Sequence, residues 1–138
     1  MILISCVENA MGLRFNRRRC SRDRAVCARI LERSGNALWL AQSSAGLFRE
    51  FPEAALHDAA DLSQVPEGAW CFWERPAPEA VPEKLLLYLW NRDYPSDEKF
   101  VFPGGEEAWC LAEENELEGY SHPLITERVY ERKERRED

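Results

Sequence analysis

The chain has 138 residues, of which 45% are hydrophobic, 11% aromatic and 31% charged. This composition is typical of one folded domain and argues against a disordered or membrane-embedded chain. The net charge of −7 is uneven, because residues 14–33 hold eight arginines against two carboxylates, a net charge of +6 that leaves −13 elsewhere. Such asymmetry predicts that one face meets an anion. We favour a small anionic molecule over a nucleic acid, because Phe15 is the only aromatic residue among these arginines.

The predicted elements alternate in the way that an α/β sheet requires. In chain order, we expect a buried strand over 2–7, a helix over 21–33 that ends at Ser34-Gly35-Asn36, a strand over 37–41, a helix over 45–51 that Pro52 ends, and strands over 69–73, 85–90, 99–102, 109–113 and 124–132. Residues 53–66 show no clear pattern. We expect one domain over residues 1–133 and a frayed, charged tail over 134–138.

The sequence predicts no signal peptide or membrane span, no disulfide bonds and no metal site. The apolar start, MILISCV, is too short for a signal peptide or a membrane span, so we predict a cytoplasmic protein with no membrane partner. Five cysteines without a C-x-x-C pair favour reduced thiols, most of them buried. His57 and His122 bring no second ligand at a zinc-binding spacing, so no metal site is predicted. The oligomeric state is left open.

Asp23 is the candidate catalytic residue. On a helical wheel that starts at Ser21, this carboxylate falls on the apolar arc, and a buried carboxylate must be paired, hydrogen-bonded or protonated. A structural role is also open, because aspartate is favoured in a first helical turn. The opposite side of the same wheel carries a predicted solvent-exposed stripe of Arg22, Arg29 and Arg33. Only the loop arginines are then left to reach a pocket, namely Arg17, Arg18 and Arg19.

The ordered series of segments resembles dihydrofolate reductase. The stretch MILISCVENAMGLRFN, followed by Asp23, is similar to the first strand, the G-I-G loop and the first helix of that family. The stretch LLLYLWNRDYPSDEKFVFP is similar to its LYLT-x-I … D-x-F-F-P segment, and GYSHPLITERVYERK is similar to its final hairpin strand. The resemblance implies a mixed α/β sheet flanked by helices, with an antiparallel C-terminal hairpin. It also implies that Asp23 matches the carboxylate that binds the amino-pyrimidine part of a pterin. Ser44 keeps the hydroxyl of the segment that grips the cofactor phosphate, although an N-cap role is also open.

The cofactor motifs of the resembled family are replaced. Arg17 to Arg19 stand in place of the Pro-Trp pair that precedes the family's first helix, and Trp73-Glu74-Arg75 stand in place of its Gly-Gly turn. Trp90 stands in place of the threonine that supports the family's catalytic carboxylate. A glycine turn lets a phosphate approach the backbone, and large side chains there should block it. We therefore expect no cofactor, and NADPH binding in the usual pose is disfavoured.

Three hypotheses for function remain. The first is a domain that binds a small anionic or pterin/nucleotide-like metabolite, with Asp23 on a ring nitrogen, Arg17 to Arg19 on the acidic part and no need for catalysis. The second is an NADPH-dependent reductase with altered cofactor binding. The third is a nucleic-acid or protein interaction module that uses the arginine stripe. MGLRFNRRRCSRDR and GYSHPLITERVYE are also similar to short clostridial-type proteins sometimes called ribonuclease Z, but the H-x-H-x-D-H cluster of that enzyme is absent.

Overall fold

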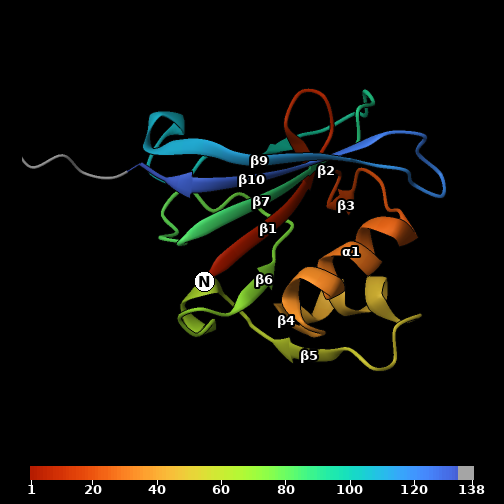
Figure 1. Cartoon of the computed structure of the whole chain (residues 1–138), viewed down its shortest axis with the longest axis horizontal. Helices are drawn as coiled ribbons and strands as arrows, with labels where there is room; N and C mark the ends of the chain where they lie inside the picture. The colour runs from red at the N-terminus through yellow and green to blue at the C-terminus, as the bar shows by residue number, and fades with distance from the viewer. Residues whose placement is uncertain (134–138) are drawn as a thin grey trace, which may run out of the picture.

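The computed structural model describes residues 1–133, and its centre is a seven-stranded mixed sheet (Figure 1). The strand order is β5-β4-β6-β1-β7-β10-β9. The five strands from β5 to β7 are parallel to one another, whereas β10 pairs antiparallel with both β7 and β9. The bounds are β1 (Ile2–Val7), β4 (Ala37–Leu40), β5 (Ala55–Asp58), β6 (Trp70–Phe72), β7 (Lys84–Leu89), β9 (Trp109–Leu117) and β10 (Ile125–Arg132). The predicted mixed α/β sheet with an antiparallel C-terminal hairpin is confirmed.

The central strands are apolar because both faces of the sheet are covered. On one face, Ile4 of β1 packs with Val26 and Ile30 of the helix α1 (Arg24–Ser34), which lies next to β4 in Figure 1. On the other face, Leu3 packs with Trp109 and with side chains from loops. The buried strands 2–7, 37–41, 69–73 and 85–90 were predictable for this reason, within one residue of most boundaries.

The helix begins later than predicted, because Asp23 is its N-cap rather than a residue of its first turn. The Asp23 side chain accepts a hydrogen bond from the amide of Ala25 at 2.9 Å, and the backbone of Asp23 is extended. The predicted stop is confirmed, since Gly35 forms the C-cap with a φ of 64° that favours glycine. The helix predicted over 45–51 is wrong. A 3₁₀ segment, η1 (Gln42–Phe48), takes its place, because Gly46 and Pro52 leave no room for a longer helix.

Several short elements were not predicted or are shorter than predicted. The hairpin of β2 (Gly12–Phe15) and β3 (Arg18–Arg19) joins β8 (Glu98–Lys99) in a second, three-stranded sheet. The strand expected over 99–102 is reduced to β8. The 3₁₀ turns η2 (Leu62–Gln64) and η3 (Glu106–Ala108) complete the described part. The predicted tail over 134–138 lies outside the described residues. Among residues 1–133, no helix combines the length and the apolar character needed to cross a membrane.

Candidate functional site

The main candidate site is a cavity of about 690 Å³ at one end of the sheet, which we call the arginine cavity. In the parallel part of the sheet, the carboxyl ends of the strands meet at the same edge, so the segments that follow β4 and β6 lie together there. The β2–β3 hairpin folds over the same end, beyond the last residue of β1 (Figure 1). The lining residues come from these three segments: Arg14, Arg17, Arg18, Arg19, Ala41, Ser43, Ser44, Trp73, Glu74 and Arg75.

The arginine cavity carries excess positive charge. Arg14 is neutralised by Glu98, with 2.7 Å between Nε and Oε2, and Arg19 forms two hydrogen bonds of 2.9 and 2.8 Å with Glu74. The other three arginines of the lining form no ion pair and no side-chain hydrogen bond with any residue of the described chain: Arg17, Arg18 and Arg75. A concave surface with three uncompensated guanidinium groups attracts anions.

A tight turn places Arg17 at the tip of the β2–β3 hairpin. Asn16 and Arg17 have φ angles of 51° and 64°, the left-handed conformation that a two-residue hairpin turn requires. The amide of Asn16 donates to the carboxylate of Asp97 at 3.1 Å, which anchors the turn. A non-glycine residue such as Arg17 is strained in this conformation, and such strain concentrates at ligand sites. The turn therefore holds a cation above the cavity.

Ser44 lies in the cavity wall and does not cap a helix. It sits inside η1 and is 5% exposed, while the N-cap of that segment is Ala41. The N-cap interpretation of Ser44 is therefore wrong. The Ser44 hydroxyl forms no hydrogen bond with any residue in 1–133, so none of these residues competes with a ligand for it. The structure thus brings the four predicted ligand-binding residues to one cavity; their role in binding stays a prediction.

Asp23 is buried, as predicted, but the carboxylate is already fully hydrogen-bonded. Its Oδ1 accepts from the amides of Ala25 and Tyr120 at 2.9 and 3.0 Å. Its Oδ2 accepts from the amide and the hydroxyl of Ser121 at 2.9 and 3.1 Å, and lies 3.0 Å from Nδ1 of His122. Burial alone would raise the pKa of Asp23, but the hydrogen bonds from His122 and the amides outweigh it and hold the pKa well below its usual range. Asp23 thereby joins the start of α1 to the β9–β10 loop.

The approach of this loop requires glycine at one position. A Cβ atom at Gly119 would lie 2.6 Å from Oδ2 of Asp23 and 2.5 Å from the carbonyl oxygen of His122. The loop can therefore close on Asp23 only because residue 119 has no side chain.

Asp23 and two of the loop arginines face different cavities. Asp23 lines a small cavity of about 20 Å³ together with Arg19 and Trp90, whereas Arg17 and Arg18 line the arginine cavity. Only Arg19 among the predicted site residues lines both. A single ligand that reaches Asp23 and all three loop arginines is therefore not what the geometry favours. The catalytic role of Asp23 stays a prediction.

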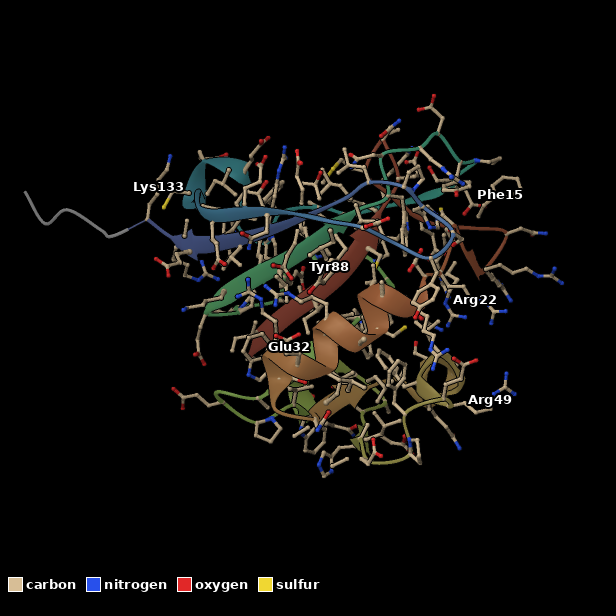
Figure 2. All side chains as sticks on the ribbon, turned by 45° about the vertical axis from the view of Figure 1, so that its right-hand side comes forward. Phe15, Arg22, Glu32, Arg49, Tyr88 and Lys133 are labelled. Carbon is tan, nitrogen blue, oxygen red and sulfur yellow. The ribbon has the colours of Figure 1, made fainter. Side chains whose placement is uncertain are left out.

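The predicted solvent-exposed arginine stripe does not exist. Arg29 and Arg33 turn toward Glu127 of β10, whose side chain is 0% exposed, with Arg–Glu distances of 2.8 Å in both cases. Tyr88 donates to the same carboxylate at 2.8 Å. The third residue, Arg22, precedes α1 and is exposed at the end of the molecule (Figure 2). The prediction failed because the partner, Glu127, comes from a strand far along the chain.

Sequence reasoning missed several residues of this region. His122 was considered from the sequence only as a zinc ligand, yet it is 2% exposed and its ring stacks on Trp90 with 4.6 Å between centroids. Nothing in the sequence links it to Asp23. Arg75 could have been found, because it follows a predicted parallel strand at the edge where the arginine cavity lies. All five cysteines are free, but Cys27 and Cys71 are the two that are buried, so the prediction that most of them are buried is wrong. No group of three or more potential metal ligands gathers among the described residues.

Comparison with known proteins identifies the fold. No protein-family model and no curated protein sequence gives a significant match to the chain. The structure is similar to that of dihydrofolate reductase from Enterococcus faecalis complexed with NADP(H) and RAB-propyl, with a TM-score of 0.64 and 9% sequence identity over 96% of each chain. The predicted dihydrofolate reductase-like fold is thus confirmed. At this identity, the likeness extends to the fold alone.

Proposed function

We propose that the domain binds a small metabolite that carries a phosphate or a comparable anionic group, in the arginine cavity. The observation that carries this proposal is the set of three uncompensated arginines, Arg17, Arg18 and Arg75, around a cavity of about 690 Å³. A guanidinium offers paired donors that match phosphate and carboxylate oxygens. The volume is in the range of pockets that hold small molecules.

The wall of the cavity supports a ligand with a flat part next to its anionic group. Trp73 contributes an aromatic surface and is 8% exposed, and Ser43 and Ser44 add hydroxyl groups beside it. A nucleotide-like molecule has this combination of a ring and an anion. Because the acceptors of Asp23 are already taken, the proposal does not use Asp23 to read a pterin ring, and it does not require catalysis.

Reductase activity with NADPH is the second candidate, and the fold is what favours it, since the similar enzyme was solved with NADP(H). Against it, Trp73 and Glu74 place side chains in the cavity where the resembled family has glycines. Glu74 is also fixed by Arg19 at 2.8 Å, so it would have to leave that arginine to clear the cavity. An anionic ligand smaller than a dinucleotide would not require Glu74 to break its ion pair with Arg19.

A thermal-shift and calorimetry series with inorganic pyrophosphate, NADPH and folate tests the proposal. We expect pyrophosphate to stabilise the protein, by about 2.7 kcal/mol at a hundredfold excess over Kd, and to lose this effect as salt rises. Arg17→Ala and Arg75→Ala should abolish the stabilisation. Arg49→Ala is the matched control, because Arg49 is exposed, lies outside the arginine cavity and forms no ion pair within residues 1–133.

Two results would contradict the proposal. One is the absence of binding by any of the three probes. The other is equal loss of binding in the Arg49→Ala control. If NADPH binds tightly and is oxidised in the presence of folate, the reductase hypothesis replaces this one.

A further inference from the structure

We propose that Ser21, His122 and Asp23 form a nucleophile, a base and an orienting carboxylate that can take an acyl group from a small activated ester. The Oγ of Ser21 lies 3.0 Å from Nε2 of His122, and Nδ1 of the same ring lies 3.0 Å from Oδ2 of Asp23. The hydroxyl, the imidazole and the carboxylate are thus connected in the order that a nucleophile and its base require. This inference is independent of the proposed function.

The hydrogen bonds of Asp23 fix the tautomer of His122. A carboxylate with a strongly lowered pKa is ionised and can only accept, so Nδ1 of His122 carries a proton toward it. Nε2 then presents its lone pair to Ser21. In this tautomer, Nε2 can receive the hydroxyl proton of Ser21, and Asp23 stabilises the imidazolium that forms.

The base is held rigidly, whereas the nucleophile is within reach of a cavity. The ring of His122 is 2% exposed and stacks on Trp90, so it cannot rotate freely. Asp23 is held by amides from both α1 and the β9–β10 loop. Ser21 is only partly buried and lines the small cavity that Arg19 and Trp90 also line. Such fixed geometry lowers the entropy cost of the reaction.

Tyr94 competes with Ser21 for the same nitrogen. Its hydroxyl lies 3.1 Å from Nε2 of His122, compared with 3.0 Å for Ser21. Neutral Nε2 has one lone pair, so only one of the two hydroxyl groups can donate to it at a time. Removal of the Tyr94 hydroxyl should therefore leave Nε2 to Ser21 alone and increase the reactivity of Ser21.

The proposed step balances with water as the only co-reactant. Ser21 Oγ attacks the ester carbonyl carbon while its proton passes to Nε2 of His122. The bond to the leaving alkoxide or phenolate then breaks, and Nε2 returns the proton to that oxygen. Water hydrolyses the acyl-serine by the same proton route and restores Ser21.

A fluorophosphonate probe and p-nitrophenyl acetate test this proposal on the full chain. We expect the probe to form one covalent adduct, located on Ser21 by peptide mapping, and to fail with Ser21→Ala. Ser63→Ala is the matched control, because Ser63 also contacts an aspartate, Asp61, but no histidine. Tyr94→Phe should increase the rate of labelling severalfold and should increase hydrolysis of the acetate in parallel.

The outcomes separate this proposal from its alternatives. Labelling that is absent in the folded wild-type protein would overturn it, as would labelling of Ser21 that Tyr94→Phe leaves unchanged or slows. His122→Gln should abolish labelling; if that variant does not fold, the Tyr94→Phe result decides. Ser21→Ala should bind pyrophosphate as the wild type does, so failure here is distinguishable from failure of the proposed function.

Discussion

The Glu127→Gln variant should lose about 2–3 kcal/mol of unfolding free energy at pH 7. Burial alone would raise the pKa of Glu127, but hydrogen bonds from Arg29, Arg33 and Tyr88 outweigh it and lower the pKa from its ordinary value of 4.5 to about 2. This difference corresponds to about 3 kcal/mol, and the partial exposure of the two arginines, 27% and 19%, screens some of it.

The pH dependence gives the sign of this effect. Because the pKa of Glu127 is lower in the folded protein, its contribution is complete above pH 4.5 and is lost as the pH falls toward 2. Urea denaturation at pH 7 and pH 3 should therefore show a smaller difference between wild type and Glu127→Gln at the lower pH. Glu114→Gln is the matched control, because its pair with Arg128 is exposed and should contribute less than about 1 kcal/mol. A loss below about 1 kcal/mol for Glu127→Gln, or a loss equal at both pH values, would refute the reasoning.

Three further predictions concern the cap, the helix end and the thiols. Asp23→Asn should lower the free energy of unfolding by about 2–3 kcal/mol in urea denaturation at pH 7. Because the pKa of Asp23 is lowered in the folded protein, the wild type should lose part of this stability below about pH 3.8. Asp61→Asn is the control and should cost less than about 1 kcal/mol, because Asp61 is an exposed cap of a short 3₁₀ turn. Gly35→Ala should lower stability by about 1 kcal/mol in thermal unfolding, because Gly35 has a positive φ. Gly46→Ala should be close to neutral, because Gly46 has open space around it and no positive φ. Equal effects of the two substitutions would contradict this prediction. Cys110 is exposed and should react first with a thiol reagent, and faster labelling of any buried cysteine would count against the packing.

The sequence predicts the centre of the fold well, for a physical reason. Strands with both faces covered, such as Ile2–Val7 and Lys84–Leu89, must be apolar throughout, so they stand out as continuous runs. An edge strand has no such requirement. Within residues 1–133, the strand Ala55–Asp58 pairs only with β4, and three of its four residues are exposed, so it leaves no pattern to recognise. The β2–β3 hairpin was missed because Leu13 is its one residue in a hydrophobic core, while its arginines line the cavity.

The parts of the candidate site that follow from the sheet topology were predictable. The contacts between side chains far apart in the sequence were not. Arg17 and Ser44 could be expected together, because the loops that follow parallel strands share one edge of the sheet. The partner of Asp23 could not, since His122 lies 99 residues away and only the closure of the final hairpin brings it near. The same applies to Arg29 and Glu127, which are 98 residues apart. A helical wheel shows which side of the helix a residue occupies, but it does not show which charged residue of another element lies on that side.

The most direct test of anion binding in the arginine cavity is an NMR titration of the arginine side-chain Nε–Hε signals with inorganic pyrophosphate. The account predicts saturable shifts of Arg17, Arg18 and Arg75 at one equivalent of ligand, with little change at Arg22 and Arg49, which do not line that cavity. Shifts confined to Arg22 and Arg49, or no saturable shift at any of the five arginines, would contradict it.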